Sequence, residues 1–331
     1  MKMSTIEVTS PYDGKVVGSV PFTDVEGVQA AIDTAYERFL DKDNWIPKHE
    51  RVAILEKLME IMSSQVEELT ILCASEGGKP YIDSKVEVLR AINGVKIAIE
   101  QIGQIEGHEI AMGHTPTSTN RIAYTMKEPI GVVAAISAFN HPFNLAIHQV
   151  IPAIAVGCPV IIRPATQTPM SACKLVELLS EAGLPEGWAQ AVVCDRTGGE
   201  LLVTSEKTAF FTFIGSGPVG WYLNSKSSPG TRAALEHGGV APVIVEPDAD
   251  IDTMIPDLVK GGFYHAGQVC VSVQRVFVHE SICDEVASKI ADGASKLVVG
   301  DQLDPKTEVG PLINHNEVNR VEEWVNEAVE K

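Results

Sequence analysis

The sequence predicts an α/β fold built on a parallel sheet. From Gly131 onward, short β-branched runs alternate with helical stretches, beginning with VVAAISAF, NLAIHQVIPAIAVG, PVIIRPA and SACKLVELLSEAG. Strands separated by amphipathic helices of this length indicate βαβ units with helices on both faces of the sheet. The runs are also apolar throughout, which is typical of buried parallel strands. A second series of the same kind begins near Arg232.

The part before Gly131 is expected to form a hairpin and a helical layer. Residues 5–23 alternate polar and apolar around Asp13-Gly14, which predicts a β-hairpin. Apolar residues at spacings of three and four predict helices over 25–40, 49–76 and 83–106. Residues 115–126, TPTSTNRIAYTM, are expected to be extended and to leave the main body.

Composition narrows the class of protein. The chain has 331 residues, of which 45% are hydrophobic and 21% charged, as in a soluble globular protein long enough for two domains. A net charge of −18, spread along the chain, argues against nucleic acid and membranes as partners. The first thirty residues lack a signal-peptide pattern and no apolar run is long enough to span a membrane, so we expect a cytoplasmic protein.

The cysteines and histidines point to neither disulfides nor a metal. Six cysteines are few for a chain of this length, and no two have C-x-x-C spacing. The nine histidines form no H-x-x-x-H pair. We therefore expect reduced thiols and no metal site.

A glycine-rich turn occupies residues 215–220. Its sequence GSGPVG has the G-x-G-x-x-G spacing of dinucleotide-binding turns, follows the apolar run AFFTF and opens a helical stretch. Backbone N–H groups at such a helix start can face a phosphate. The usual fingerprint follows the first strand of its fold, however, whereas this turn follows several βα units. A purely structural strand-to-helix turn remains the alternative.

Further segments fit one known pattern together with this turn. They are AFNHPFNL (138–145), RPATQTP (163–169), LEHGG (235–239), GQVC (267–270), VQRVFVHE (273–280) and GDQLDPKTEVGPL (300–312). With these motifs in this order, the sequence resembles the aldehyde dehydrogenase superfamily from end to end. The resemblance implies a Rossmann-type NAD(P)-binding domain over 1–233, with an extended oligomerisation segment near 112–128. It also implies the N-terminal part of a second α/β, catalytic domain over 234–331, and a homodimer or homotetramer for the full-length protein.

The resemblance assigns the chemistry to three residues. Cys270 matches the nucleophile, whose thiolate adds to an aldehyde to give a thiohemiacetal and, after hydride departure, a thioester. Asn140 matches the side chain that forms the oxyanion hole with the Cys270 N–H. Glu236 matches the base that activates water for thioester hydrolysis, so it is expected to hold no ribose. The alternative for Cys270 is an inert cysteine in the core, and the alternative for Glu236 is a solvated glutamate in a loop. Two residues, His237 and Ile214, depart from the family pattern.

The resemblance implies NAD(P)-dependent oxidation of an aldehyde to a carboxylic acid. Arg163 and Thr166 stand where the family usually has lysine and glutamate, which favours NADP over NAD because a guanidinium can bind a 2′-phosphate that a carboxylate would repel. Alternatively, Arg163 replaces lysine on a ribose hydroxyl. The other cofactor contacts that the resemblance implies are Phe139, Ala165, Gly199, Gly215, Ser216, Val219 and Gly238.

The substrate is much less defined by the sequence. Arg90 lies where some relatives that act on anionic aldehydes carry an arginine, and His141 directly follows Asn140. Phe143 is a third candidate contact. Short hydroxyaldehydes or semialdehydes are the expected substrates. The alternative for Arg90 is a surface cation that pairs with acidic neighbours on its helix.

The final helical pattern, HNEVNRVEEWVNEAVEK, reaches Lys331 without a capping residue. Family members usually continue for about another third of their length. The catalytic domain is therefore expected to lack strands, expose an apolar face and turn over poorly. A truncated, catalytically silent member that binds nucleotide or a partner chain is the alternative function.

Overall fold

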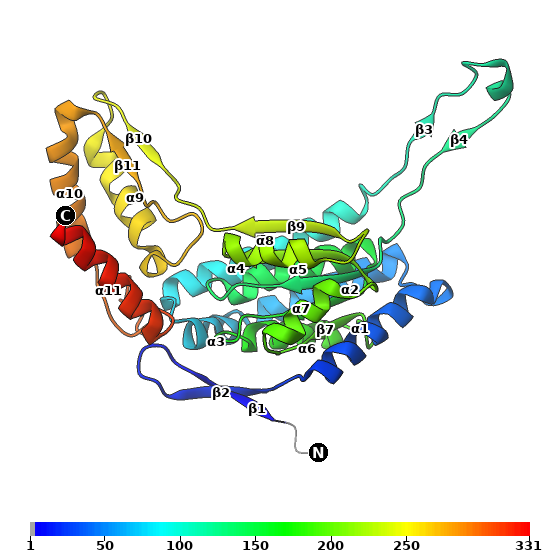
Figure 1. Ribbon diagram of the computed structural model, residues 1–331, viewed down its shortest axis with the longest axis horizontal. Coiled ribbons are helices and arrows are strands. Elements are labelled where there is room, and N and C mark those ends of the chain that lie inside the picture. Colours follow the sequence, from blue (N-terminus) through cyan, green and yellow to red (C-terminus); the bar gives the residue numbers. More distant parts are fainter. Residues whose placement is uncertain (1–3) are drawn as a thin grey trace.

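A five-stranded parallel sheet forms the centre of the computed structural model, which describes residues 4–331 (Figure 1). Its strands are β5 (Val132–Ile136), β6 (Val160–Arg163), β7 (Ala189–Ala191), β8 (Thr208–Gly215) and β9 (Arg232–His237). Their order across the sheet is β7-β6-β5-β8-β9. The chain therefore builds outward from β5, first to one side and then to the other.

Helices cover both faces of this sheet and create two cores. Helices α5 (Pro142–Val156) and α6 (Met170–Glu181) pack on one face, and α1 (Val25–Leu40), α7 (Arg196–Thr204) and α8 (Gly217–Lys226) lie on the other. Strand β5 shows the alternation, because Val133 and Ala135 enter one core whereas Val132, Ala134 and Ile136 enter the other. This arrangement confirms the predicted α/β class.

The N-terminal helical layer covers α5 and α6. It contains α2 (Lys48–Ser64), α3 (Val66–Gly77) and α4 (Tyr81–Ile102), with a short 3-10 turn, η1 (Lys42–Asn44), before it. The single helix expected over 49–76 is divided at Gln65, whose φ of −111° and ψ of 19° lie outside the helical region. Helix α3 ends at Gly78, where a φ of 71° gives the left-handed backbone that favours glycine.

Two antiparallel β-ribbons accompany these layers. The predicted hairpin is formed by β1 (Thr5–Thr9) and β2 (Val16–Pro21), and Gly14 has the positive φ that its turn needs. A second ribbon, of β3 (Glu109–Ile110) and β4 (Ala123–Tyr124), carries a 3-10 turn, η2 (Pro116–Ser118), and projects from the body as a long arm (Figure 1). The extended segment expected over 115–126 thus leaves the main body, as predicted.

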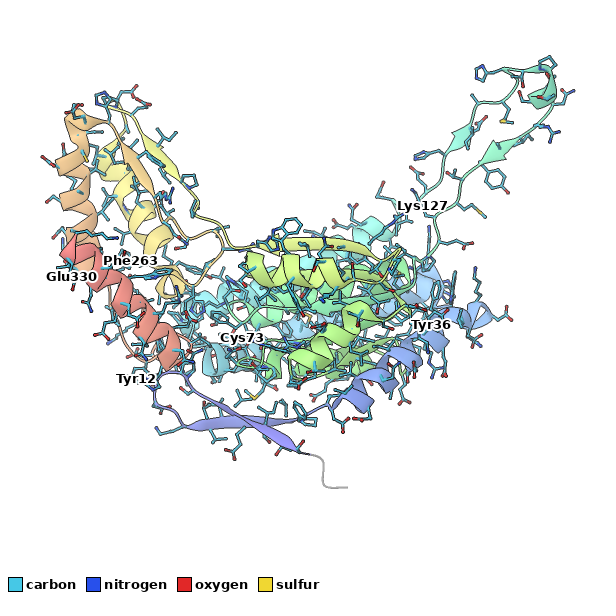
Figure 2. All side chains as sticks on the ribbon, in the orientation of Figure 1. Tyr12, Tyr36, Cys73, Lys127, Phe263 and Glu330 are labelled. Carbon is cyan, nitrogen blue, oxygen red and sulfur yellow. The ribbon has the colours of Figure 1, made fainter. Side chains whose placement is uncertain are left out.

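The C-terminal part stands at the opposite end of the molecule from the arm. It contains the parallel pair β10 (Val243–Val245) and β11 (Val276–Val278) with helices α9 (Ile251–Phe263), α10 (Cys283–Ser295) and α11 (His315–Glu330), and the 3-10 turns η3 (Tyr264–Gly267) and η4 (Glu280–Ile282). In Figure 2, Phe263 and Glu330 mark this part and Lys127 the base of the arm. Strand β9 continues in the central sheet to His237, past the boundary expected after residue 233, and the division into two domains stays a prediction.

No helix within residues 4–331 has both the length and the apolar character needed to cross a membrane. Within the same residues, no three side chains of histidine, cysteine, aspartate or glutamate are grouped as metal ligands would be.

Candidate active site

The carboxyl ends of the parallel strands bring distant residues to one edge of the sheet. Asn140 follows β5, Arg163 ends β6, Ser216 follows β8, and Glu236 lies near the end of β9. Strands β5 and β8 are neighbours, yet the chain leaves them toward opposite sides of the sheet. Such a switch point is where open α/β sheets bind their ligands.

Cys270 lies beside Glu236 at this edge. Its Sγ atom is 3.8 Å from Oε1 of Glu236, with the thiol donating to the carboxylate. Burial raises the pKa of the Cys270 thiol, and the negative charge of Glu236 raises it further. The thiol is therefore protonated near neutral pH and has a base at hand to accept its proton.

The side chain of Asn140 is fixed from the loop that carries Cys270. Its Nδ2 donates to the carbonyl oxygen of Gln268, at 2.9 Å, which leaves the second N–H of the amide available. Gln268 is held in turn, because its Nε2 donates to the carbonyls of His265 and Pro311 and its Oε1 accepts from the N–H of Ile313. The nucleophile loop and Asn140 are thereby tied to one another.

Three consecutive left-handed residues shape the loop before Gln268. His265, Ala266 and Gly267 have φ values of 49°, 55° and 76°. Only the glycine adopts this region without strain, so the first two residues store conformational energy near the nucleophile. The His265 ring is fully buried, lies edge-on to Phe139 at 6.4 Å, and has a pKa well below its usual value because of that burial.

The glycine-rich turn has the geometry of an anion cradle. Helix α8 begins directly after Ser216, whose side chain makes no capping bond, so the first-turn N–H groups of Gly217 and Val219 have no intrahelical acceptor. A Cβ on Gly220 would lie 2.2 Å from Nε2 of His237. The third glycine therefore allows α8 to pack closely on the end of β9, where His237 departs from the family pattern. The turn follows the fourth strand of the sheet in chain order, as the sequence indicated.

Arg163 lies across the start of α7. Its Nη2 donates to the carbonyl of Cys194 at 3.2 Å, whereas its Nε is buried with no partner among residues 4–331. A Cβ on Gly199 would come within 3.0 Å of the Arg163 side chain, so Gly199 makes room for it. Thr166 is exposed nearby and bonds only to the neighbouring Gln167 side chain among the described residues.

These features fit a dinucleotide. An arginine with an unpaired buried N–H and a helix start with unpaired N–H groups both favour an anionic ligand such as a phosphate. Phe139 and Ala165 are half-buried, Val219 is 48% exposed on α8, and a Cβ on Gly238 would meet open space. Their roles as cofactor contacts stay predictions.

The residues expected to meet substrate differ in their exposure. Arg90 is exposed on α4, and His141 stacks on Tyr264 with its Nε2 3.3 Å from the Tyr264 hydroxyl. Burial lowers the pKa of His141 to about 4, helped by the nearby Lys79 ammonium, so its ring is neutral at physiological pH. Phe143 is fully buried in the core. Its role as a substrate contact stays a prediction.

Comparison with known proteins fits this geometry. Residues 1–331 match the aldehyde dehydrogenase family. The chain belongs to this family. It is 38% identical over 327 residues to a 3-sulfolactaldehyde dehydrogenase of Priestia megaterium, covering 98% of this chain and 68% of that protein.

Two solved aldehyde dehydrogenases superpose closely on this one. Aldehyde dehydrogenase 21 of Physcomitrella patens, in complex with the reaction product succinate, has a TM-score of 0.94 at 34% identity, covering 100% of this chain and 69% of that chain. Glyceraldehyde-3-phosphate dehydrogenase of Methanocaldococcus jannaschii, complexed with NADP, has a TM-score of 0.93 at 34% identity, covering 99% of this chain and 71% of that chain.

Several residues of this aldehyde dehydrogenase site had no role in the sequence interpretation. His148 lies on α5, two helical turns after His141, and its pKa is lowered by partial burial and by the nearby Arg90 guanidinium. Its i,i+7 spacing from His141 was the available signal. Gln268 stood inside the quoted motif GQVC, and its fixing role appears only once the Pro311–Ile313 segment is seen beside it.

Proposed function

We propose that this aldehyde dehydrogenase oxidises an aldehyde to a carboxylic acid with NAD(P), through a covalent intermediate on Cys270. The observation that carries the proposal is the 3.8 Å approach of the Cys270 Sγ to Glu236, in a site that also holds the amide of Asn140. A nucleophile, a base and an oxyanion donor are the groups that acyl chemistry needs.

Acylation begins when Glu236 accepts the thiol proton. The sulfur of Cys270 then attacks the carbonyl carbon of the aldehyde, and the developing alkoxide is stabilised by the Asn140 Nδ2 and the Cys270 backbone N–H. The product of this addition is the thiohemiacetal, whose oxygen carries the negative charge. Loss of one such donor typically costs about 3 kcal/mol of barrier height.

Arg163, the N-terminus of α8, Ser216 and Gly199 would hold the dinucleotide. A dinucleotide bound there would supply the hydride acceptor that the oxidation needs. NADP is favoured because Arg163 supplies a guanidinium and Thr166 brings no carboxylate near it, and because the Methanocaldococcus relative is solved with NADP.

Hydrolysis of the thioester completes the cycle. Glu236 is exposed on the edge strand β9, so it can release the thiol proton to solvent and then take a proton from the water that attacks the acyl group. The carboxylic acid leaves, and the Cys270 thiol is restored. One carboxylate thus serves both half-reactions.

The substrate is proposed to be a short aldehyde that carries an anionic group. The names of the relatives above include a sulfonate, a carboxylate product and a phosphate ester. Arg90 and His148 lie on neighbouring helices, and the guanidinium is close enough to lower the pKa of His148. The carboxylate of Glu236 partly opposes this lowering of the His148 pKa, which supports a position of His148 near the proposed base.

The same proposal includes a homo-oligomeric assembly and a cytoplasmic location. The arm exposes Ile122, Tyr124 and Met126, at 89%, 67% and 71%, which suits a contact between subunits of a homo-oligomer. The evenly spread net charge of −18 suits an enzyme of the cytoplasm that binds neither nucleic acid nor membranes.

Cys270→Ala tests the function, with Cys283→Ala, at an exposed cysteine, as the control. Aldehyde-dependent formation of reduced cofactor should vanish in Cys270→Ala and persist in Cys283→Ala, while both still bind NADP. Undiminished turnover of Cys270→Ala would overturn the proposal. No turnover by the unaltered chain on a panel of aldehydes, with NADP binding intact, would favour the catalytically silent alternative.

A further inference from the structure

A buried ion pair contacts the backbone of Asn140, the proposed oxyanion donor. Lys79, in the turn between α3 and α4, pairs with Glu87 on α4, and the side chains of the two residues are 1% and 0% exposed. Taking two charges out of water costs several kcal/mol, and hydrophobic residues of similar volume often stabilise a fold as well or better. Stability alone therefore gives a weak reason for this pair.

The Lys79 ammonium contacts the residue that carries the oxyanion donor. Its Nζ donates to the backbone carbonyl of Asn140 at 3.2 Å, across 61 positions of sequence. The preceding carbonyl, of Phe139, accepts from the buried Thr168 hydroxyl at 3.4 Å. Two consecutive peptide groups before α5 are therefore fixed from outside their own segment.

Glu87 fixes the other side of the same segment. Its Oε1 accepts from the backbone N–H of Phe143, at 3.0 Å, and of Asn144, at 2.9 Å, which lie in the first turn of α5. His141, at the N-cap position of α5, makes no side-chain capping bond. The carboxylate of Glu87 thus replaces the missing cap and complements the positive end of the helix.

We propose that Lys79 and Glu87 form a positioning pair that sets the orientation of the Asn140 amide for catalysis. The inference rests on the proposed function. Lys79 holds the Asn140 carbonyl, Glu87 holds the helix that begins two residues later, and their ion pair joins the two contacts. Neither side chain touches the reacting atoms, so both act through Asn140.

A double variant separates positioning from folding. Lys79→Met with Glu87→Gln leaves no uncompensated charge, fills both side-chain volumes, and keeps an amide oxygen that can accept from Phe143 and Asn144. It removes the hydrogen bond to the Asn140 carbonyl. The matched control is Lys96→Met with Glu100→Gln, an exposed pair on the same helix.

We expect kcat of the double variant to fall about ten- to a hundredfold, since a misplacement of about 1 Å costs about that much. The KM for aldehyde, the Kd for NADP and the Tm should stay close to those of the unaltered enzyme. The control should keep its kcat. Single-turnover formation of reduced cofactor should slow in parallel with kcat.

A thermodynamic cycle with Asn140→Ala decides how the pair acts. If Lys79 and Glu87 work through Asn140, the double variant should lower the single-turnover rate little further once Asn140 is alanine. An equal fall in both backgrounds would overturn the proposal in favour of general structural damage, as would an unchanged kcat in the double variant. If the double variant does not fold, Lys79→Gln with Glu87→Gln, which also leaves no uncompensated charge, should show a fall in kcat with the same dependence on Asn140.

Failure of the positioning pair can be distinguished from failure of the proposed function. An unaltered chain without aldehyde oxidation would remove both proposals. An active chain whose double variant matches it in kcat would remove the positioning pair alone.

Discussion

The Sγ atom of Cys270 lies 3.8 Å from Oε1 of Glu236, across 34 positions of sequence. The carboxylate has opposite effects on this thiol. Its charge raises the thiol pKa, which disfavours the thiolate, and its oxygen can accept the proton when the thiol attacks. Substituting Glu236 should therefore affect the resting thiol and the reaction in different directions.

Glu236→Gln should lower the pKa of Cys270 and stop turnover. Alkylation of Cys270 by iodoacetamide should become faster near neutral pH, because removing the neighbouring charge increases the thiolate fraction. Addition of aldehyde and NADP should still give one equivalent of reduced cofactor, formed from the Cys270 that ionises without Glu236, and the reaction should then stall at the thioester. Both measurements belong in a Cys283→Ser background, since Cys283 is the exposed cysteine. Slower alkylation together with normal turnover would show that another base serves.

Thr166→Glu should shift cofactor preference from NADP toward NAD by about 1 to 2 kcal/mol. The new carboxylate would repel a 2′-phosphate and offer an acceptor to a ribose hydroxyl. Gln167→Glu is the control, because it places the same charge one position along on an exposed residue. Dissociation constants of both dinucleotides give the answer, and tighter binding of NAD by the unaltered chain would refute the assignment of Arg163 to a 2′-phosphate.

Arg90→Met should lower kcat/KM for anionic aldehydes by about 1 kcal/mol, or roughly fivefold, as expected for an exposed charge. Activity on a neutral aldehyde of similar size should not change. Lys96→Met, which removes an exposed cation from the same helix, controls for net charge. Equal losses on both substrates would mean that Arg90 acts on the helix and not on the substrate.

Glu76 should make stability depend on pH. Burial raises the pKa of its carboxyl from 4.5 to about 7, with a smaller contribution from repulsion by Glu87, while hydrogen bonds from Met170 and Ser171 at the start of α6 oppose the rise. Between these two pH values the folded protein binds the extra proton, so the contribution of Glu76 to the free energy of unfolding is greatest below about 4.5. It falls by about 3 kcal/mol as pH rises to about 7.

Glu76→Gln removes this titration. Urea unfolding at a series of pH values should show a shallower decline in the variant than in the unaltered chain, and the difference isolates Glu76 from the other titratable groups. Glu68→Gln, at an exposed position on the same helix, should leave the slope unchanged. Parallel curves for Glu76→Gln and the unaltered chain would contradict the assignment.

Local sequence patterns predicted most of the helices and strands and the ordered motifs. They could not predict features that depend on residues far apart in the sequence. The Asp13-Gly14 turn, the run of residues 25–40 and the GSGPVG turn each depend on neighbours in sequence, so their structure is legible there. The break between α2 and α3 at Gln65 could not be read from the sequence, because no glycine or proline marks it.

Contacts between distant segments could not be predicted from the sequence. The glutamate that caps α5 lies 56 positions before its partner Phe143, and an apolar helix shows which side chains are buried without showing what lies opposite them. For the same reason the sequence does not show that Phe143 packs in the core. The edge where Asn140, Arg163 and Glu236 meet follows from parallel strands, but their distances required the fold.

The exposed face of the β10–β11 pair should promote self-association. Ile244 and Phe277 are direct partners across this two-stranded sheet, and they are 74% and 55% exposed. Adjacent apolar side chains on a short sheet form a patch that gains free energy when another surface covers it. Ile244→Thr with Phe277→Thr should lower the mass measured by sedimentation velocity at high protein concentration, whereas Leu40→Thr, at a separate position that is 58% exposed, should not. The substitutions keep β-propensity and the backbone pairing, so Tm should hold or rise slightly. A chain that is monomeric at every concentration, with or without these substitutions, would show that the patch is too small to drive association.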